Sequence, residues 1–241
     1  MPLRAILLDL DDTLLETTPA HQAAIRAAVD HAAERLPHRQ PAELEATFRA
    51  VYVAVEARVE GGELRFDTSQ HFRTRVWEET LREHDLAPDL GLELAGVYRA
   101  ERRRRYRLYE ESLEVLAALS PRYRLVLVTN GPSDFQREKI AAVGLEPKVH
   151  GVVVSGELGH WKPAPEIFHH ALELAGASPS QALMVGDSLR HDIAGARAAG
   201  LHTLWVRRYP ELQPVNHAHP DHAPHHEAAH LRDLPSLAAR L

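Results

Sequence analysis

Five short apolar runs constrain the fold of this chain more than any other feature. They occupy residues 3–8, 124–128, 149–154, 182–185 and 203–206, and helical patterns follow three of them at 133–143, 164–175 and 189–199. Strands that alternate with helices in this way are typical of a parallel sheet. Because the runs are continuously apolar rather than alternating, both faces of the sheet are expected to be covered. The sequence therefore predicts an α/β fold in which helices pack on both faces of a parallel sheet.

A long interval separates the first apolar run from the second. Residues 16–112 lack strand signals, and apolar side chains recur at helical spacing in stretches such as 48–55 and 72–77. One crossover helix does not need so many residues, so we predict an α-helical domain, residues 17–111, inserted after the first strand. Residues 1–16 and 112–241 would then form the core, which has a common domain size.

Composition limits the classes of function. The formal net charge of -6 gives no support for nucleic acid as the main partner. The chain has no cysteine, which excludes disulfides and thiolate chemistry. The apolar stretch at the N-terminus meets three acids at once, and no apolar run approaches the length of a membrane span. We expect a soluble, cytoplasmic protein with neither nucleic acid nor membrane as a partner.

Two segments rich in basic side chains have more than one interpretation. Residues 99–107, with arginine at each of positions 102–105, suggest a nucleic-acid contact or a solvated helix face. The negative net charge of the chain favours the solvated helix face. Residues 217–230 hold six histidines. Their spacing repeats no metal-ligand template, which favours an exposed loop before a last short edge strand and a helix at 234–241 over metal capture.

Two carboxylates follow the first apolar run. Asp9 and Asp11 are two positions apart, so a strand that continues to them points both side chains to the same side. Two like charges held together are costly unless a cation or a proton stabilises them. The alternative is a polar turn, because Asp and Thr also favour loops and helix caps.

Polar residues follow three other predicted strands at the same edge of the sheet. They are Thr129-Asn130-Gly131, Lys162, and Asp187 with Asp192. Each has a structural alternative as a helix cap, a surface lysine or an ion-pair partner. Lysine is scarce in this arginine-rich chain, at positions 139, 148 and 162 only, so each one is a candidate for a specific role. Because the carboxyl ends of parallel strands meet at one edge, we predict a single site.

This set of motifs resembles that of the haloacid dehalogenase-like (HAD) hydrolase superfamily, in its C1-capped phosphatase branch. The matching motifs are Asp9-Leu10-Asp11-Asp12-Thr13, Thr129-Asn130-Gly131, Lys162-Pro163-Ala164-Pro165 and Gly186-Asp187-Ser188 with Asp192, in the same order and at similar spacing. The resemblance implies a Rossmann-like core and identifies the inserted helices as a cap domain. Asp12 stands where the family often has glycine.

The resemblance also implies roles for the acidic residues. Asp9 would be the nucleophile that forms an aspartyl-phosphate. Asp9, Asp187 and the backbone carbonyl of Asp11 would hold Mg²⁺, a cation that prefers oxygen ligands. The side chain of Asp11 would protonate the leaving group and then activate water.

The remaining motif residues would bind the phosphoryl group and orient its neighbours. Lys162 would offset negative charge, and Thr129 with the N–H groups near Asn130 would bind the phosphoryl oxygens. Asp192 would orient Lys162 or a metal-bound water.

These residues predict an Mg²⁺-dependent phosphatase that hydrolyses a small phosphomonoester, such as a nucleotide or a sugar phosphate. The family's dehalogenases lack an acid two residues after the nucleophile, so Asp11 favours phosphoryl transfer. The alternatives are a phosphomutase or phosphotransferase on a sugar phosphate, and a phospho-accepting receiver-like signalling module.

Three arginines of the inserted helices have two interpretations. Arg65, Arg73 and Arg75 could bind an anionic group of the substrate, or they could be charges on helix surfaces. The sequence does not predict the oligomeric state.

Overall fold

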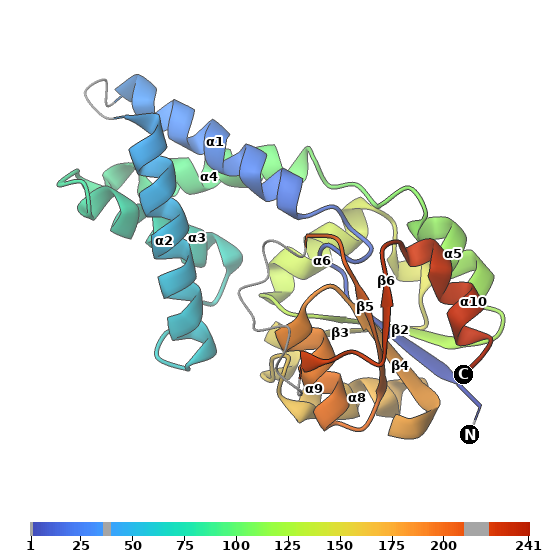
Figure 1. Cartoon of the computed structure of the whole chain (residues 1–241). Coiled ribbons are helices and arrows are strands. Elements are labelled where there is room, and N and C mark those ends of the chain that lie inside the picture. The colour runs from blue at the N-terminus through green and yellow to red at the C-terminus, as the bar shows by residue number, and fades with distance from the viewer. Residues whose placement is uncertain (1, 36–39, 210–221) are drawn as a thin grey trace. The chain divides into compact units, whose positions relative to one another are not determined.

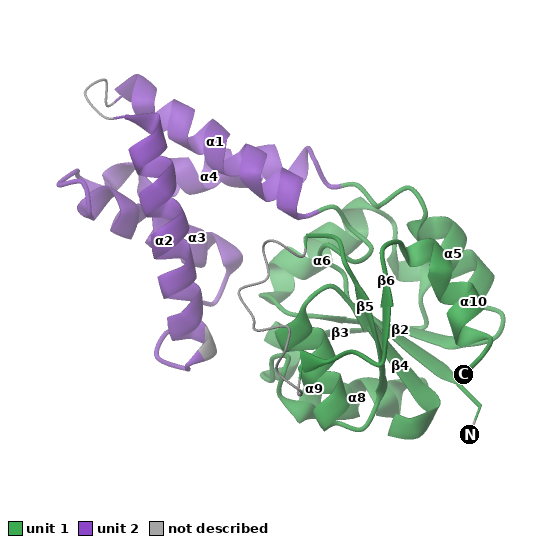
Figure 2. Ribbon diagram, in the orientation of Figure 1, with its two compact units in different colours: residues 1–16, 107–241 green, residues 17–106 purple. Residues whose placement is uncertain are grey.

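The computed structural model (Figure 1) describes residues 2–35, 40–209 and 222–241. The chain divides into two compact units, Met1–Glu16 with Arg107–Leu241 and Thr17–Tyr106 (Figure 2). The second unit ends before residue 111, the predicted end of the insertion. The carbonyl of Arg107 accepts a hydrogen bond from the N–H of Glu16 (3.0 Å), and that of Leu14 accepts one from Tyr109 (3.0 Å). These bonds assign the returning chain to the first unit.

The first unit is built on one six-stranded sheet in which all paired strands are parallel, in the order β3-β2-β1-β4-β5-β6. The strands are β1 (Ala5–Leu8), β2 (Arg124–Thr129), β3 (Gly151–Val154), β4 (Ala182–Gly186), β5 (His202–Val206) and β6 (His226–Ala228). The predicted parallel sheet is confirmed. From β1 the chain moves outward to β2 and β3 and then crosses to β4 on the other side of β1, so the strand order reverses at the centre of a Rossmann-like sheet.

Helices cover both faces of this sheet. They are α5 (Ser112–Leu119), α6 (Ser133–Ala142), α7 (Ser155–Leu158), α8 (Pro165–Ala175), α9 (Gly195–Ala198) and α10 (Leu234–Ala238), with 3-10 turns at Glu146–Lys148, Pro179–Gln181 and Leu231–Asp233. Leu7 and Val126 pack in one cluster with Phe168 of α8. Ile6 and Leu125, which point to the other face, are also fully buried. Figure 1 shows α5 and α10 side by side, away from α8 and α9.

The second unit is α-helical over its described residues. Its helices are α1 (Thr18–Arg35), α2 (Pro41–Glu60), α3 (Ser69–Arg82) and α4 (Gly91–Arg103), with a 3-10 turn at Pro88–Leu90. Phe48, Trp77 and Tyr98 form its aromatic centre, and the rings of Phe48 and Trp77 lie 4.3 Å apart. The unit thus has a hydrophobic core of its own.

The arginine run differs from the solvated helix face that its sequence predicts. Arg103, Arg104 and Arg105 are exposed, but Arg102 is 5% exposed and donates a hydrogen bond to the hydroxyl of Tyr98 at 2.9 Å. The prediction was wrong for this residue because one position in each helical turn faces the core.

Two predictions near the C-terminus need correction. The last strand, β6, lies inside the histidine-rich segment and not after it; residues 217–221 of that segment lie outside the described residues. The Nδ1 atom of His225 accepts a hydrogen bond from the N–H of Thr203 (3.1 Å), which ties the segment to β5. The final helix ends at Ala238 instead of 241.

The helix predicted at 189–199 is divided. Residues Leu189–Ala194 form a π-helical segment (η4), and α9 follows it. Among the described helices, none has the length and apolar character to cross a bilayer.

Candidate active site

The candidate site residues gather at the carboxyl edge of the sheet, where the strand order reverses. Asp9 directly follows β1, Asp187 directly follows the neighbouring β4, and Thr129 ends β2. The N–H of Asp9 donates to the carbonyl of Val185 at 2.9 Å, so the hydrogen bonding between β1 and β4 extends to Asp9 itself. This crevice is the usual ligand-binding position of an open α/β sheet.

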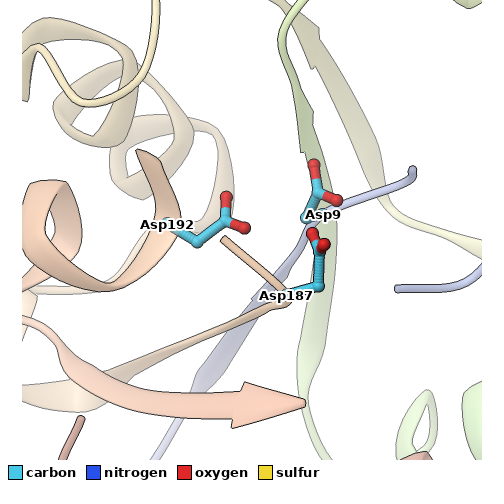
Figure 3. Close-up of side chains that lie close together, drawn as sticks. All are labelled: Asp9, Asp187 and Asp192. Carbon is cyan, nitrogen blue, oxygen red and sulfur yellow. The ribbon is translucent and has the colours of Figure 1, made fainter. Parts of the chain in front are cut away.

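Three carboxylates turn toward one another there (Figure 3). One oxygen each from Asp9, Asp187 and Asp192 lies within 4.8 Å of the others. The buried carboxylates of Asp9 and Asp192 and the half-buried carboxylate of Asp187 face one buried ammonium, that of Lys162, so negative charge exceeds positive charge. A small divalent cation with oxygen ligands fits this donor set and this charge.

Lys162 is held by three acceptors. Its Nζ atom donates to Asp9 Oδ1 at 2.6 Å, to Asp192 Oδ1 at 2.7 Å and to the carbonyl of Val128 at 2.8 Å. These are all the hydrogen bonds that an ammonium can donate. Burial by itself would lower the pKa of Lys162, but Asp192 and Asp9 outweigh it and raise the pKa. Lys162 is therefore a fixed positive charge against Asp9.

The pKa values of Asp9 and Asp187 are shifted toward the neutral forms of these acids. Burial raises the pKa of the Asp9 carboxyl to about 7; Lys162 opposes this, while Asp192 and Asp11 add to it. Burial, with Asp9 and Asp192 nearby, raises the pKa of Asp187 well above its ordinary value. Lys162 alone thus does not neutralise the cluster.

Gly186, the last residue of β4, lets Asp192 approach the cluster. A Cβ atom at this position would overlap the carboxylate of Asp192. Asp192 accepts from Lys162 through Oδ1 and from the N–H of Ser188 through Oδ2 at 3.0 Å. Asp192 therefore anchors Lys162 and the first turn of η4 together.

Thr129 and Asn130 have different surroundings. Thr129 is fully buried at the end of β2, and its hydroxyl oxygen lies 2.5 Å from Gln136 Nε2. The side chain of Asn130 binds the backbone of Lys162: Nδ2 donates to its carbonyl at 2.9 Å and Oδ1 accepts from its N–H at 2.8 Å. The Asn130 side chain thus holds the lysine loop, so the backbone N–H is the group of Asn130 that remains for the predicted contact with a phosphate.

The side chain of Asp11 does not belong to the three-carboxylate cluster. The turn after β1 passes through Asp12, whose φ of 53° is in the left-handed region that Asp adopts more readily than most residues. Both oxygens of Asp11 accept hydrogen bonds from Lys139 Nζ at 2.6 Å, and Oδ2 also accepts from Gln136 Nε2 at 3.0 Å.

Sequence reasoning did not assign Gln136 and Lys139 to the site. Both lie on α6, three positions apart, and each is 1% exposed. The available signal was the scarcity of lysine, together with two polar residues at the i, i+3 spacing that shares one helix face.

The chain matches a known family over most of its length. Residues 3–200 match the model of the haloacid dehalogenase-like hydrolases. The chain belongs to this family of hydrolases. As an HAD-like hydrolase, it has a parallel sheet, and acidic residues of its sequence motifs lie at the ends of β1 and β4.

Its similarity to known proteins extends over the whole chain. The phosphoserine phosphatase of Thermus thermophilus is 37% identical, over 96% of this chain and 98% of that one. The glyceraldehyde 3-phosphate phosphatase of Methanopyrus kandleri is 30% identical, over 99% and 98%. The crystal structure of the HAD hydrolase YfnB of Bacillus subtilis bound to magnesium superposes with a TM-score of 0.77 at 26% identity and covers 99% of both chains.

The HAD-like hydrolase described here is a phosphatase. The relatives from Thermus thermophilus and Methanopyrus kandleri, each matched along nearly its full length, are both named phosphatases. An acid at position 11, two residues after Asp9, agrees with this class of enzyme.

Proposed function

We propose that the protein is an Mg²⁺-dependent phosphatase that hydrolyses small phosphomonoesters through an aspartyl-phosphate on Asp9. The observation that carries this proposal is the position of Asp9, which is buried at the end of β1, in contact with Lys162 and beside two further carboxylates. A carboxylate whose charge is offset by a fixed ammonium can approach a phosphate dianion with less repulsion.

Mg²⁺ would be held by Asp9 and Asp187, with the backbone carbonyl of Asp11. When bound, it would neutralise charge on the phosphoryl oxygens and orient the substrate. Both oxygens of Asp192 already accept hydrogen bonds, which favours a role through Lys162 or a metal-bound water.

In the first step, a carboxylate oxygen of Asp9 would form a bond to phosphorus while the bond from phosphorus to the leaving oxygen breaks. Asp11 would give its proton to that oxygen. In the second step, Asp11 would take a proton from water as the water attacks phosphorus, and the bond to Asp9 would break to release phosphate. The Thr129 hydroxyl, the Asn130 N–H and Lys162 would bind the phosphoryl oxygens.

The substrate would be a small phosphorylated metabolite, and the helical unit would select it as a cap. The relatives named for phosphoserine and glyceraldehyde 3-phosphate make these two compounds the first to test. Nucleotide and hexose phosphates complete the panel.

The test is phosphate release from this panel with and without Mg²⁺, for the unsubstituted protein and for Asp9→Asn. We expect Mg²⁺-dependent release by the unsubstituted protein and a loss of at least about 10³-fold in Asp9→Asn, because the amide is nearly isosteric but a poor nucleophile. Retention of more than a few per cent of the activity would contradict the assignment of Asp9. Transfer to added hexose phosphate with little free phosphate would indicate a mutase instead.

A further inference from the structure

We infer that Lys139 and Gln136, the two buried polar residues of α6, are positioning residues that orient the carboxylate of Asp11 for proton transfer. The inference rests on the proposed function, because it assigns Asp11 the proton-transfer role. Neither residue belongs to the motifs by which the site was predicted.

Lys139 binds the carboxylate of Asp11 from the protein interior. Its Nζ atom lies 2.6 Å from each oxygen of Asp11, and the lysine is 1% exposed. The same ammonium lies 4.2 Å from the centre of the Phe135 ring, on the preceding turn of α6. The Asp11 side chain is 28% exposed. The carboxylate is thus held on its buried side while part of the side chain stays exposed to solvent, which suits a group that transfers protons to a substrate.

Gln136 joins Asp11 to the end of β2. Its Nε2 atom lies within hydrogen-bond distance of Asp11 Oδ2 (3.0 Å), Thr129 Oγ1 (2.5 Å) and the carbonyl of Asn130 (2.5 Å). An amide nitrogen carries two hydrogens, so these acceptors share the donor. One side chain therefore sets the distance between the proposed proton donor and a proposed phosphate-binding residue.

The backbone between β2 and α6 leaves space for the side chain of Gln136. Gly131 has a φ of 147°, and a Cβ atom there would lie 3.0 Å from the Gln136 side chain. The chain between β2 and α6 therefore needs glycine both for its conformation and for the space that the glutamine occupies.

The alternative is a purely structural ion pair. A charged pair that is buried on one side is costly to break, since removal of one partner leaves the other without compensation. Such a pair would stabilise the fold without affecting proton transfer. The two roles differ in how the loss of activity depends on the leaving group.

The test compares Lys139→Met with Asp11→Asn and the double variant on two phosphomonoesters. One is p-nitrophenyl phosphate, whose leaving group needs little protonation. The other is an alkyl phosphate, phosphoserine or glyceraldehyde 3-phosphate, whichever the unsubstituted protein hydrolyses faster. The measured quantity is kcat/KM, which reports the first phosphoryl transfer.

We expect Lys139→Met to lower kcat/KM by about 10- to 100-fold for the alkyl phosphate and by less than about 5-fold for p-nitrophenyl phosphate, since general acid catalysis contributes about 10² to 10⁴. Asp11→Asn should show the same selectivity, and the double variant should be no worse than Asp11→Asn alone. Lys139→Arg should recover part of the loss. Lys148→Met, at an exposed lysine, is the matched control and should change neither value.

Equal losses on the two substrates, or losses that multiply in the double variant, would overturn the inference while the proposed function stands. Absence of any phosphomonoester turnover by the unsubstituted protein would remove the proposed function and this inference together. If Lys139→Met does not fold, Gln136→Met removes the other donor to Asp11 and should show the same selectivity with a smaller loss.

Discussion

Asp9 combines two properties that conflict in the protein without a cation. The proposed attack on phosphorus requires its ionised form, yet burial raises its pKa to about 7, and the pKa of Asp187 is raised as well. A raised pKa in the folded state means that the folded protein binds protons more tightly than the unfolded chain. The contribution of Asp9 to stability is therefore present below its ordinary pKa of 3.8 and is lost as the pH rises through about 7.

A pH-dependent effect of Mg²⁺ on stability follows from these carboxyl groups. The protein without metal should become less stable between about pH 5 and pH 8, and Mg²⁺ should raise the Tm more at the higher pH. Free Mg²⁺ at about 100 times its Kd stabilises by about 2.7 kcal/mol, or roughly 5–10 °C for a protein of this size. Differential scanning calorimetry at the two pH values measures this.

Asp9→Asn is the matched variant for that measurement, since it should flatten the dependence of the metal-free Tm on pH. Asp67→Asn, at an exposed acid outside the site, should leave the dependence unchanged. An Mg²⁺ effect that is equal at both pH values would argue against binding at these carboxylates.

At the scale of elements, the contact between β4 and η4 determines the geometry of the site. Gly186 ends β4, and the carboxylate of Asp192 occupies the space where a side chain would begin. Asp192 in turn holds Lys162 at 2.7 Å, so a change at the end of one strand is transmitted to a residue on another segment.

Gly186→Ala should displace Asp192 and loosen Lys162. We expect a loss of stability of about 1–3 kcal/mol from overpacking and a fall in kcat of at least about 10-fold. Urea denaturation and phosphate release measure the two effects. The control is Gly96→Ala, because a Cβ atom at this exposed position of α4 meets nothing within 4 Å. That variant should keep its activity and gain up to about 1 kcal/mol.

For the whole molecule, the important property is that each unit has its own hydrophobic core. Trp77 is buried in the helical unit and Phe168 in the unit that carries the sheet. Both side chains are fully buried, so truncation of either should cost about 3–5 kcal/mol.

Because the cores are separate, Trp77→Ala should lower the stability of Thr17–Tyr106 and leave the sheet unit less affected, and Phe168→Ala should do the reverse. Native-state hydrogen exchange, which resolves cooperative units, measures both. Uniform loss of protection along the chain in either variant would show that the two units unfold as one.

The sequence by itself determined the α/β class, the inserted helices and the candidate residues at four strand ends. These features depend on local periodicity and on motifs next to each strand, and both are visible along the chain. The asparagine at position 130 was selected on the same grounds, although its side chain binds the Lys162 backbone.

Only the tertiary structure decided which side chains touch. Lys139 and Asp11 are 128 positions apart, and no pattern along the chain links them. Arg102 is buried although the three arginines that follow it are exposed, and β6 forms within the histidine-rich segment because it pairs with β5. Contacts between distant segments arise from packing of the whole unit, which a local pattern does not encode.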